Sequence, residues 1–204
     1  IKDTDGNTVT TWVSTDEPHR VTGLHFGEAY TLTEIRAADG YALADDITFR
    51  LIQKVDEDGN PLEECEVYYL TTKNILFWKW DDWKLLGDAT VIMRDDITKV
   101  QISKKDLTTK EELPGAELTL TDEKGNEIDR WVSTDAPHYM ERLPAGKYTL
   151  TEVTAPDGYA IAERVEFEVL PTGEVQTFEM FDDTIKVKIS KVDITTNEEL
   201  PGAE

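Results

Sequence analysis

The sequence lacks the features that define several common protein classes. It has one cysteine, Cys65, in 204 residues, so no disulfide can form within the chain. No apolar run reaches the ~18 residues of a membrane-spanning helix, and no sustained 3.6-residue apolar period predicts long helices. No signal peptide precedes Ile1, which stands inside a repeating pattern, so we expect the chain to be a piece of a longer protein.

Basic residues are also scarce: 21 Lys and Arg stand against 43 Asp and Glu, for a formal net charge of -22. A surface this acidic repels phosphate backbones and anionic lipid, so nucleic acid and membrane surfaces are not expected partners. Hydrophobic residues still make up 39% of the chain, which is enough for a packed core. We therefore interpret the acidic surface as a source of solubility.

Internal repetition is the strongest signal in the sequence. Five motifs recur in the same order, which chance does not produce. The first and second occurrences are 12–16 and 131–135 (WVSTD), 30–34 and 148–152 (YTLTE), 39–42 and 157–160 (DGYA), 93–96 and 180–183 (MRDD and MFDD), and 102–117 and 189–204, which both begin ISK and end LPGAE.

The repeats predict three parts in the chain. Residues 1–98 form a repeat that lacks its first strand and carries a long aromatic insertion at about 50–90. Residues 99–185 form a complete repeat, and residues 186–204 hold the first strand of a third. No Gly/Ser-rich or Pro-rich linker separates the parts, so we expect a stiff series of domains.

Short strands between turn signals dominate the pattern. Apolar and polar residues alternate over 147–153 and 164–170, as in half-buried strands. Pairs such as Asp5-Gly6 and Gly125-Asn126 predict tight turns. Strands at this spacing predict an all-β fold of tandem antiparallel β-sandwiches.

Three apolar stripes of the complete repeat end in an ionisable residue of the same strand parity, which places the charge on the core face. The stripes are Val100, Ile102, Lys104; Tyr148, Leu150, Glu152; and Phe178, Met180, Asp182. Isolated buried charges are costly, so such groups pair, neutralise or react.

Two interpretations of these charges remain open from spacing alone. In the first, Lys104 forms a buried or rim salt bridge with Asp182 or Glu152. In the second, burial lowers the pKa of the lysine and raises that of the carboxyl, so a neutral amine faces a protonated acid. The amine then condenses with the acid, and Glu152 moves the protons.

Five stretches of the complete repeat carry a family resemblance: 102–106 (ISKKD), 113–116 (LPGA), 131–133 (WVS), 148–152 (YTLTE) and 155–159 (APDGY). They resemble the CnaB-type domains, also called prealbumin-like or SpaA-like, of Gram-positive surface proteins and pilins. The parent domain of the SpyTag/SpyCatcher pair is a close match. The resemblance implies a reverse-immunoglobulin, prealbumin-like sandwich in each repeat.

The resemblance also implies site residues. In this family an autocatalytic isopeptide bond joins a lysine of the first strand to an Asn or Asp of the last strand, assisted by a glutamate. The matching positions here are Lys104, Asp182 and the proton-shuttling Glu152, with water as the by-product. The equivalents elsewhere are incomplete half-sites: Glu34 and Asp95 in the first repeat and Lys191 in the third.

The implied function is a structural stalk of a cell-surface adhesin or pilus, which is extracellular and anchored to the cell wall. Its partners are the neighbouring repeats of the same polypeptide. Its chemistry is a single-turnover self-crosslink rather than enzymatic turnover, and no cofactor is expected. Neither a signal nor a wall anchor is found within residues 1–204.

The insertion in the first repeat supports an alternative function. Trp78, Trp80 and Trp83 lie close together there, and exposed aromatics suggest contact with a host glycan or matrix protein. The competing interpretation is an enlarged hairpin that packs its aromatics onto its own domain. The spacing of Asp56, Asp58 and Asn60 lacks the Gly and Glu of a calcium loop, so we expect a turn there and no metal site.

Overall fold

The computed structural model describes residues 1–75 and 78–202, with the side chains of 73–75, 78 and 79 also left undescribed. The described residues form strands and loops without a helix, and so no helix in them could span a membrane. The chain divides into two compact units. Unit 1 comprises 1–98, 142–144 and 171–173, and unit 2 comprises the remaining residues.

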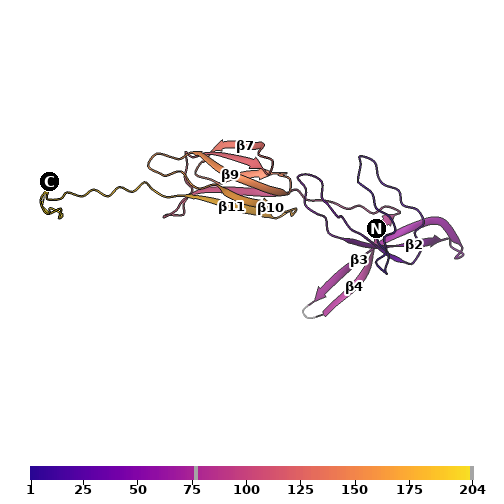
Figure 1. Cartoon of the computed structure of the whole chain (residues 1–204). Coiled ribbons are helices and arrows are strands. Elements are labelled where there is room, and N and C mark those ends of the chain that lie inside the picture. The colour runs from indigo at the N-terminus through magenta and orange to yellow at the C-terminus, as the bar shows by residue number, and fades with distance from the viewer. Residues whose placement is uncertain (76–77, 203–204) are drawn as a thin grey trace. The chain divides into compact units, whose positions relative to one another are not determined.

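Unit 1 contains one four-stranded antiparallel sheet in the order β1-β2-β3-β4. Its strands are β1 (Ala29–Leu32), β2 (Ile47–Val55), β3 (Pro61–Ile75) and β4 (Trp78–Asp88). The long β3–β4 hairpin extends from this sheet (Figure 1) and accounts for most of the insertion. Tyr30, Phe49 and Val67 are the buried centre of its core, which is the face that strand alternation predicts.

The expected last strand of the first repeat does not form. Residues 91–95 are assigned no strand, and Asp95 is exposed instead of pointing into the core. The physical reason is visible in unit 2, where the last strand pairs with the first strand and with no other. No strand among the described residues offers residues 91–95 that pairing.

Unit 2 contains two sheets (Figure 1). The first has the order β10-β9-β6-β7 and the second the order β11-β5-β8. The strands of the first are β6 (Glu117–Asp122), β7 (Glu127–Val132), β9 (Gly146–Thr154) and β10 (Val165–Val169). Those of the second are β5 (Lys99–Asp106), β8 (His138–Glu141) and β11 (Val175–Asp182).

One pairing in unit 2 is parallel. β5 and β11 run side by side in the same direction, from Lys99 opposite Val175 to Asp106 opposite Asp182, while the other strand pairs are antiparallel. The first and last strands of the unit therefore end at the same edge of the sheet.

The core of unit 2 lies between its two sheets. Ile102 on β5 and Met180 on β11 are each 1% exposed, and Leu118, Leu120 and Leu150 of the opposite sheet are fully buried. The ring of Phe167 on β10 stacks on that of Phe178 on β11 with centroids 4.0 Å apart. Residues of alternating parity therefore meet across the sandwich as the sequence pattern requires.

The hairpin turns share one local design. In the turn between β6 and β7, Asp122 Oδ1 accepts hydrogen bonds from the Lys124 and Asn126 amides at 2.9 and 2.8 Å. Asp56 makes the equivalent bonds in the turn between β2 and β3, to the amides of Asp58 and Asn60 at 3.0 and 2.8 Å. The calcium-like spacing of these residues therefore belongs to a turn.

Residues 186–202 form no strand, although their sequence led us to expect the first strand of a third repeat. Val187 is 78% exposed and Ile189 is 90% exposed, so these two side chains are not covered by any sheet of the described residues. A lone strand gains neither ladder hydrogen bonds nor a buried face, and therefore stays extended coil.

Candidate functional site

Three ionisable side chains meet inside unit 2. Lys104 comes from β5, Glu152 from β9 and Asp182 from β11, and their side chains are 1%, 0% and 0% exposed. Lys104 Nζ lies 3.0 Å from Glu152 Oε1 and donates a hydrogen bond to Asp182 Oδ1. The structure thus places together the three residues that the sequence singled out.

Strand pairing explains this meeting. The parallel register sets Lys104 opposite Met180, two positions before Asp182. Residues two apart on a strand point to the same face, so the lysine stem and the aspartate extend into the core from adjacent strands. Glu152 enters from the facing sheet, where Leu118 of β6 is its register partner.

The two carboxylates are incompletely satisfied. Glu152 Oε2 accepts a hydrogen bond from the Ala162 amide at 2.6 Å. Within the described part of the chain, Glu152 Oε1 and Asp182 Oδ2 accept no hydrogen bond, so the contact of Oε1 with Nζ is one of charge without hydrogen-bond alignment. Leaving a buried oxygen in this condition costs about 1–3 kcal/mol, and more for a charged group.

The electrostatics of the site make Asp182 easier to protonate than an exposed aspartate. Burial raises the pKa of Asp182 to about 6, against the lowering effect of the Lys104 ammonium and with a further raising contribution from Glu152. One lysine stands between two carboxyl groups in a medium of low polarity, and its charge cannot neutralise both. A protonated Asp182 would therefore stand directly against Lys104 Nζ.

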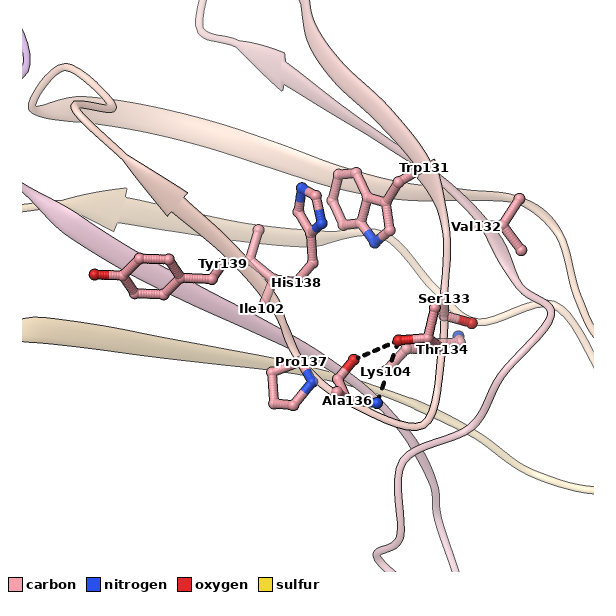
Figure 2. A pocket seen from close by; sticks show the side chains of 10 residues that line it. All are labelled: Ile102, Lys104, Trp131, Val132, Ser133, Thr134, Ala136, Pro137, His138 and Tyr139. Carbon is pink, nitrogen blue, oxygen red and sulfur yellow. Dashed lines mark hydrogen bonds between the residues drawn. The ribbon is translucent and has the colours of Figure 1, made fainter.

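A pocket of about 110 Å³ has Lys104 among its lining residues. Figure 2 shows it lined by Ile102 and Lys104 of β5 and by residues 131–134 and 136–139. The Trp131 and His138 rings stack there with their centroids 4.2 Å apart, and His138 Nε2 lies 2.8 Å from Asp129 Oδ2. We did not predict this stack, although the paired recurrence of Trp and His in the repeats is its signal.

The same ring stack occurs in unit 1. Trp12 and His19 stack with centroids 4.5 Å apart, at the positions that match Trp131 and His138 in the repeat alignment. The recurring Trp and His residues therefore mark a structural contact of the repeat.

The predicted half-sites are only partly assembled. Glu34 Oε2 accepts a hydrogen bond from the Ala44 amide at 2.9 Å, which repeats the bond between Glu152 and Ala162. Asp95 and Lys191 are both exposed, so neither lies in a buried cluster like that of Lys104.

The tryptophans of the insertion differ from one another. Trp80 is 41% exposed, while the Arg50 guanidinium covers the ring of Trp83 at 4.3 Å from its centroid. The side chain of Trp78 lies outside the described residues. Cys65, on β3, is a free thiol of intermediate exposure.

Comparisons with known proteins identify the fold of unit 2. Residues 98–184 match the family model of the SpaA prealbumin-like fold domain. No curated protein matches the chain.

Several solved structures are similar to the chain. The Bacillus anthracis TIE protein has 22% identity and a TM-score of 0.41, with 69% of this chain and 29% of that chain covered. The shaft pilin SpaA of Lactobacillus rhamnosus GG has 15% identity and a TM-score of 0.38, with coverage of 71% and 73%. BcpA, the major pilin subunit of Bacillus cereus, has 16% identity and a TM-score of 0.38, with coverage of 69% and 43%. The chain thus spans less than a third of the TIE protein.

Proposed function

With residues 98–184 forming a SpaA-type prealbumin-like domain, we propose that the chain is a structural module in the stalk of a Gram-positive surface protein or pilus. Unit 2 stabilises itself by an isopeptide bond between Lys104 and Asp182. The observation that carries this proposal is the buried contact of Lys104 Nζ with both Asp182 and Glu152. The module is extracellular, and its partners are the neighbouring repeats of its own polypeptide.

The reaction needs only groups that the site contains. The Lys104 ammonium gives a proton to Asp182, which burial favours in its neutral form. The free amine attacks Asp182 Cγ, and Glu152 accepts the proton that Nζ loses as the C–N bond forms. Glu152 returns this proton to the hydroxyl group, which departs as water when the C–O bond breaks.

Burial supplies a reason for the reaction to proceed. Before it, an ammonium and two carboxyl groups share a site from which water is excluded. After it, an amide replaces the ammonium and one carboxyl group, so the penalty for burying that ion pair disappears. Each molecule reacts once, and the product remains part of the fold, so the chain is not a turnover enzyme.

The position of the bond suits a load-bearing stalk. The chain enters unit 2 through β5 and leaves through β11, and these two strands are adjacent and parallel. A bond between Lys104 and Asp182 transfers tension directly from the first strand to the last. The intervening strands and loops then lie outside the path of the force.

Intact mass tests the proposal. The chain should be lighter than its sequence mass by one water, about 18 Da, and Lys104→Ala or Asp182→Ala should restore the full mass. Lys105→Ala is a matched control, since the side chain of Lys105 pairs with Glu179 on the outer face and its removal should keep the deficit. A full unmodified mass in the wild-type chain would refute the isopeptide.

The chain should lose one water and not two. Glu34 and Asp95 are proposed to be the glutamate and aspartate of an equivalent site, and Lys191 the lysine of another. The contact between Glu34 and Ala44 supports this assignment, because it repeats the contact that orients Glu152. Each half-site needs a partner strand before it can react.

A second candidate function is ligand binding by the insertion. The exposure of Trp80 at 41%, with Leu85 and Leu86 on the same strand at 54% and 42%, favours it. We would titrate glycans and matrix proteins while recording tryptophan fluorescence. Quenching that Trp80→Ala abolishes would support an adhesin role, and the absence of any response would leave the stalk function alone.

A further inference from the structure

Tyr159 connects the two strands that carry the reacting residues. Its hydroxyl donates a hydrogen bond to Asp106 Oδ2 at 2.7 Å. Asp106 is the last residue of β5, two positions beyond Lys104 and opposite Asp182 in the strand register. Tyr159 lies in the segment between β9 and β10 and therefore contacts the end of the strand that carries Lys104.

The backbone around Tyr159 holds the other strand. The Ala160 amide donates to the Asp183 carbonyl at 3.0 Å, and the Ile185 amide donates to the Gly158 carbonyl at 2.9 Å. These bonds hold the chain immediately after Asp182, at the end of β11. The segment 158–160 is thus bound by its backbone to the residues that follow β11, and by the hydroxyl of Tyr159 to the end of β5.

The backbone bonds of this arrangement recur in unit 1. There, the Ala42 amide donates to the Asp96 carbonyl at 2.8 Å and the Thr98 amide to the Gly40 carbonyl at 3.1 Å. The backbone contact is therefore a property of the repeated Asp-Gly-Tyr-Ala motif. In unit 2 the tyrosine of this motif also bonds Asp106, at the end of the strand that carries Lys104.

The bond to Asp106 is one between a charged acceptor and a neutral donor. Hydrogen bonds from the Thr109 and Thr108 amides and from Tyr159 lower the pKa of Asp106. The same bond to Asp106 raises the pKa of Tyr159, so its hydroxyl keeps its proton. Charge-assisted bonds of this kind are strong and hold a defined geometry.

We propose that Tyr159 is a positioning residue for the condensation of Lys104 with Asp182. It holds the ends of β5 and β11 in a fixed register through Asp106, and so keeps Nζ within reach of the carboxyl carbon. Its hydroxyl bonds Asp106 and not a reacting residue. This inference rests on the proposed function, because it concerns the rate of the same reaction.

The test measures how fast the bond forms in the full chain. Wild-type, Tyr159→Phe and Tyr139→Phe chains are made by cell-free translation, quenched in denaturant at set times and weighed by mass spectrometry. Tyr159→Phe should lose water about tenfold more slowly, the kinetic equivalent of one hydrogen bond to a charged group. Tyr139, which is 49% exposed on β8, should tolerate phenylalanine without change.

A double-mutant cycle separates positioning from a general loss of stability. Asp106→Asn should also slow the reaction, and the double variant should be no slower than the slower single one, since both remove the same link. Rates are compared at a temperature where circular dichroism shows every variant fully folded. Equal rates for wild type and Tyr159→Phe, or additive effects in the cycle, would overturn this inference alone. Absence of water loss in wild type would overturn the proposed function as well.

Discussion

Glu152→Gln should prevent the covalent bond from forming while the packing around it is kept. Glutamine has nearly the shape of glutamate and still offers a carbonyl oxygen to the Ala162 amide, which Glu152 now accepts at 2.6 Å. It cannot accept the proton from Lys104 Nζ, so the condensation should fail. Lys104 and Asp182 would remain as a buried pair in a folded domain.

The size of the effect follows from the loop that the bond closes. Lys104 and Asp182 are 78 positions apart in the sequence. Loop-closure entropy for a cross-link of that span gives about 4.5 kcal/mol of stability at 25 °C. For a domain of this size, such a change lowers the melting temperature by roughly 20–35 °C.

Calorimetry on the wild type and the variant measures this difference. Unit 1 has its own core around Tyr30, Phe49 and Val67, so its transition provides an internal control that should not move. The variant should have the full sequence mass and a lower transition for unit 2. A variant that keeps the mass deficit would refute the role of Glu152, and an unmoved transition in an uncondensed variant would refute the estimate of stability.

Two further predictions concern the site and its support. In Lys104→Met, burial still raises the pKa of Asp182, and the opposing ammonium is gone. A carboxyl whose pKa is higher in the folded than in the unfolded state stabilises the fold at pH values below its unfolded-state pKa. This contribution is lost as the pH rises through its folded-state pKa. Denaturant unfolding should therefore find unit 2 of Lys104→Met more stable at about pH 5 than at pH 8, with no such component in the condensed wild type, where Asp182 no longer titrates. Ser133→Ala should lower the free energy of unfolding by about 1–3 kcal/mol, because the Ser133 hydroxyl bonds the Ala116 amide and the Leu113 carbonyl inside the core. Thr134→Ala, at an exposed neighbour, is its control, and an equal effect of both variants would contradict the assigned role.

The buried trio was predictable because it depends on a local rule. Strand parity alone placed Lys104, Glu152 and Asp182 on the same faces as the apolar residues two and four positions before them. All three are buried in the structure. Parity indicates which way a side chain points, and three ionisable side chains that point into one small core must lie close to one another.

Parity could not predict which strands pair with one another. Alternation in β5 and β11 does not reveal that these strands are neighbours or that they run parallel, because pairing is decided by the rest of the sandwich. The bond between Tyr159 and Asp106 spans 53 positions, and no local pattern announces it. Tyr159 belongs to the recurring Asp-Gly-Tyr-Ala motif, but the motif does not indicate the contact of its side chain.

Two nearly identical segments show which local structure depends on neighbouring residues and which depends on distant strands. Residues 99–106 and 186–193 differ only at their third and seventh positions. In both, the final aspartate accepts hydrogen bonds from the amides two and three residues later, at 2.6 and 2.8 Å for Asp106 and at 2.6 and 3.1 Å for Asp193. The turn forms in each case because its donors and acceptor are close in sequence.

The residues before the two turns behave differently. Residues 99–106 form β5 between β11 and β8, whereas residues 186–191 remain coil with exposed apolar side chains. Nearly the same sequence is thus a strand only where two partners satisfy its backbone and an opposing sheet covers its face. Among the described residues, Lys104 therefore has an environment for condensation that Lys191 does not have, and this difference arises from the neighbouring strands and not from the residues around either lysine.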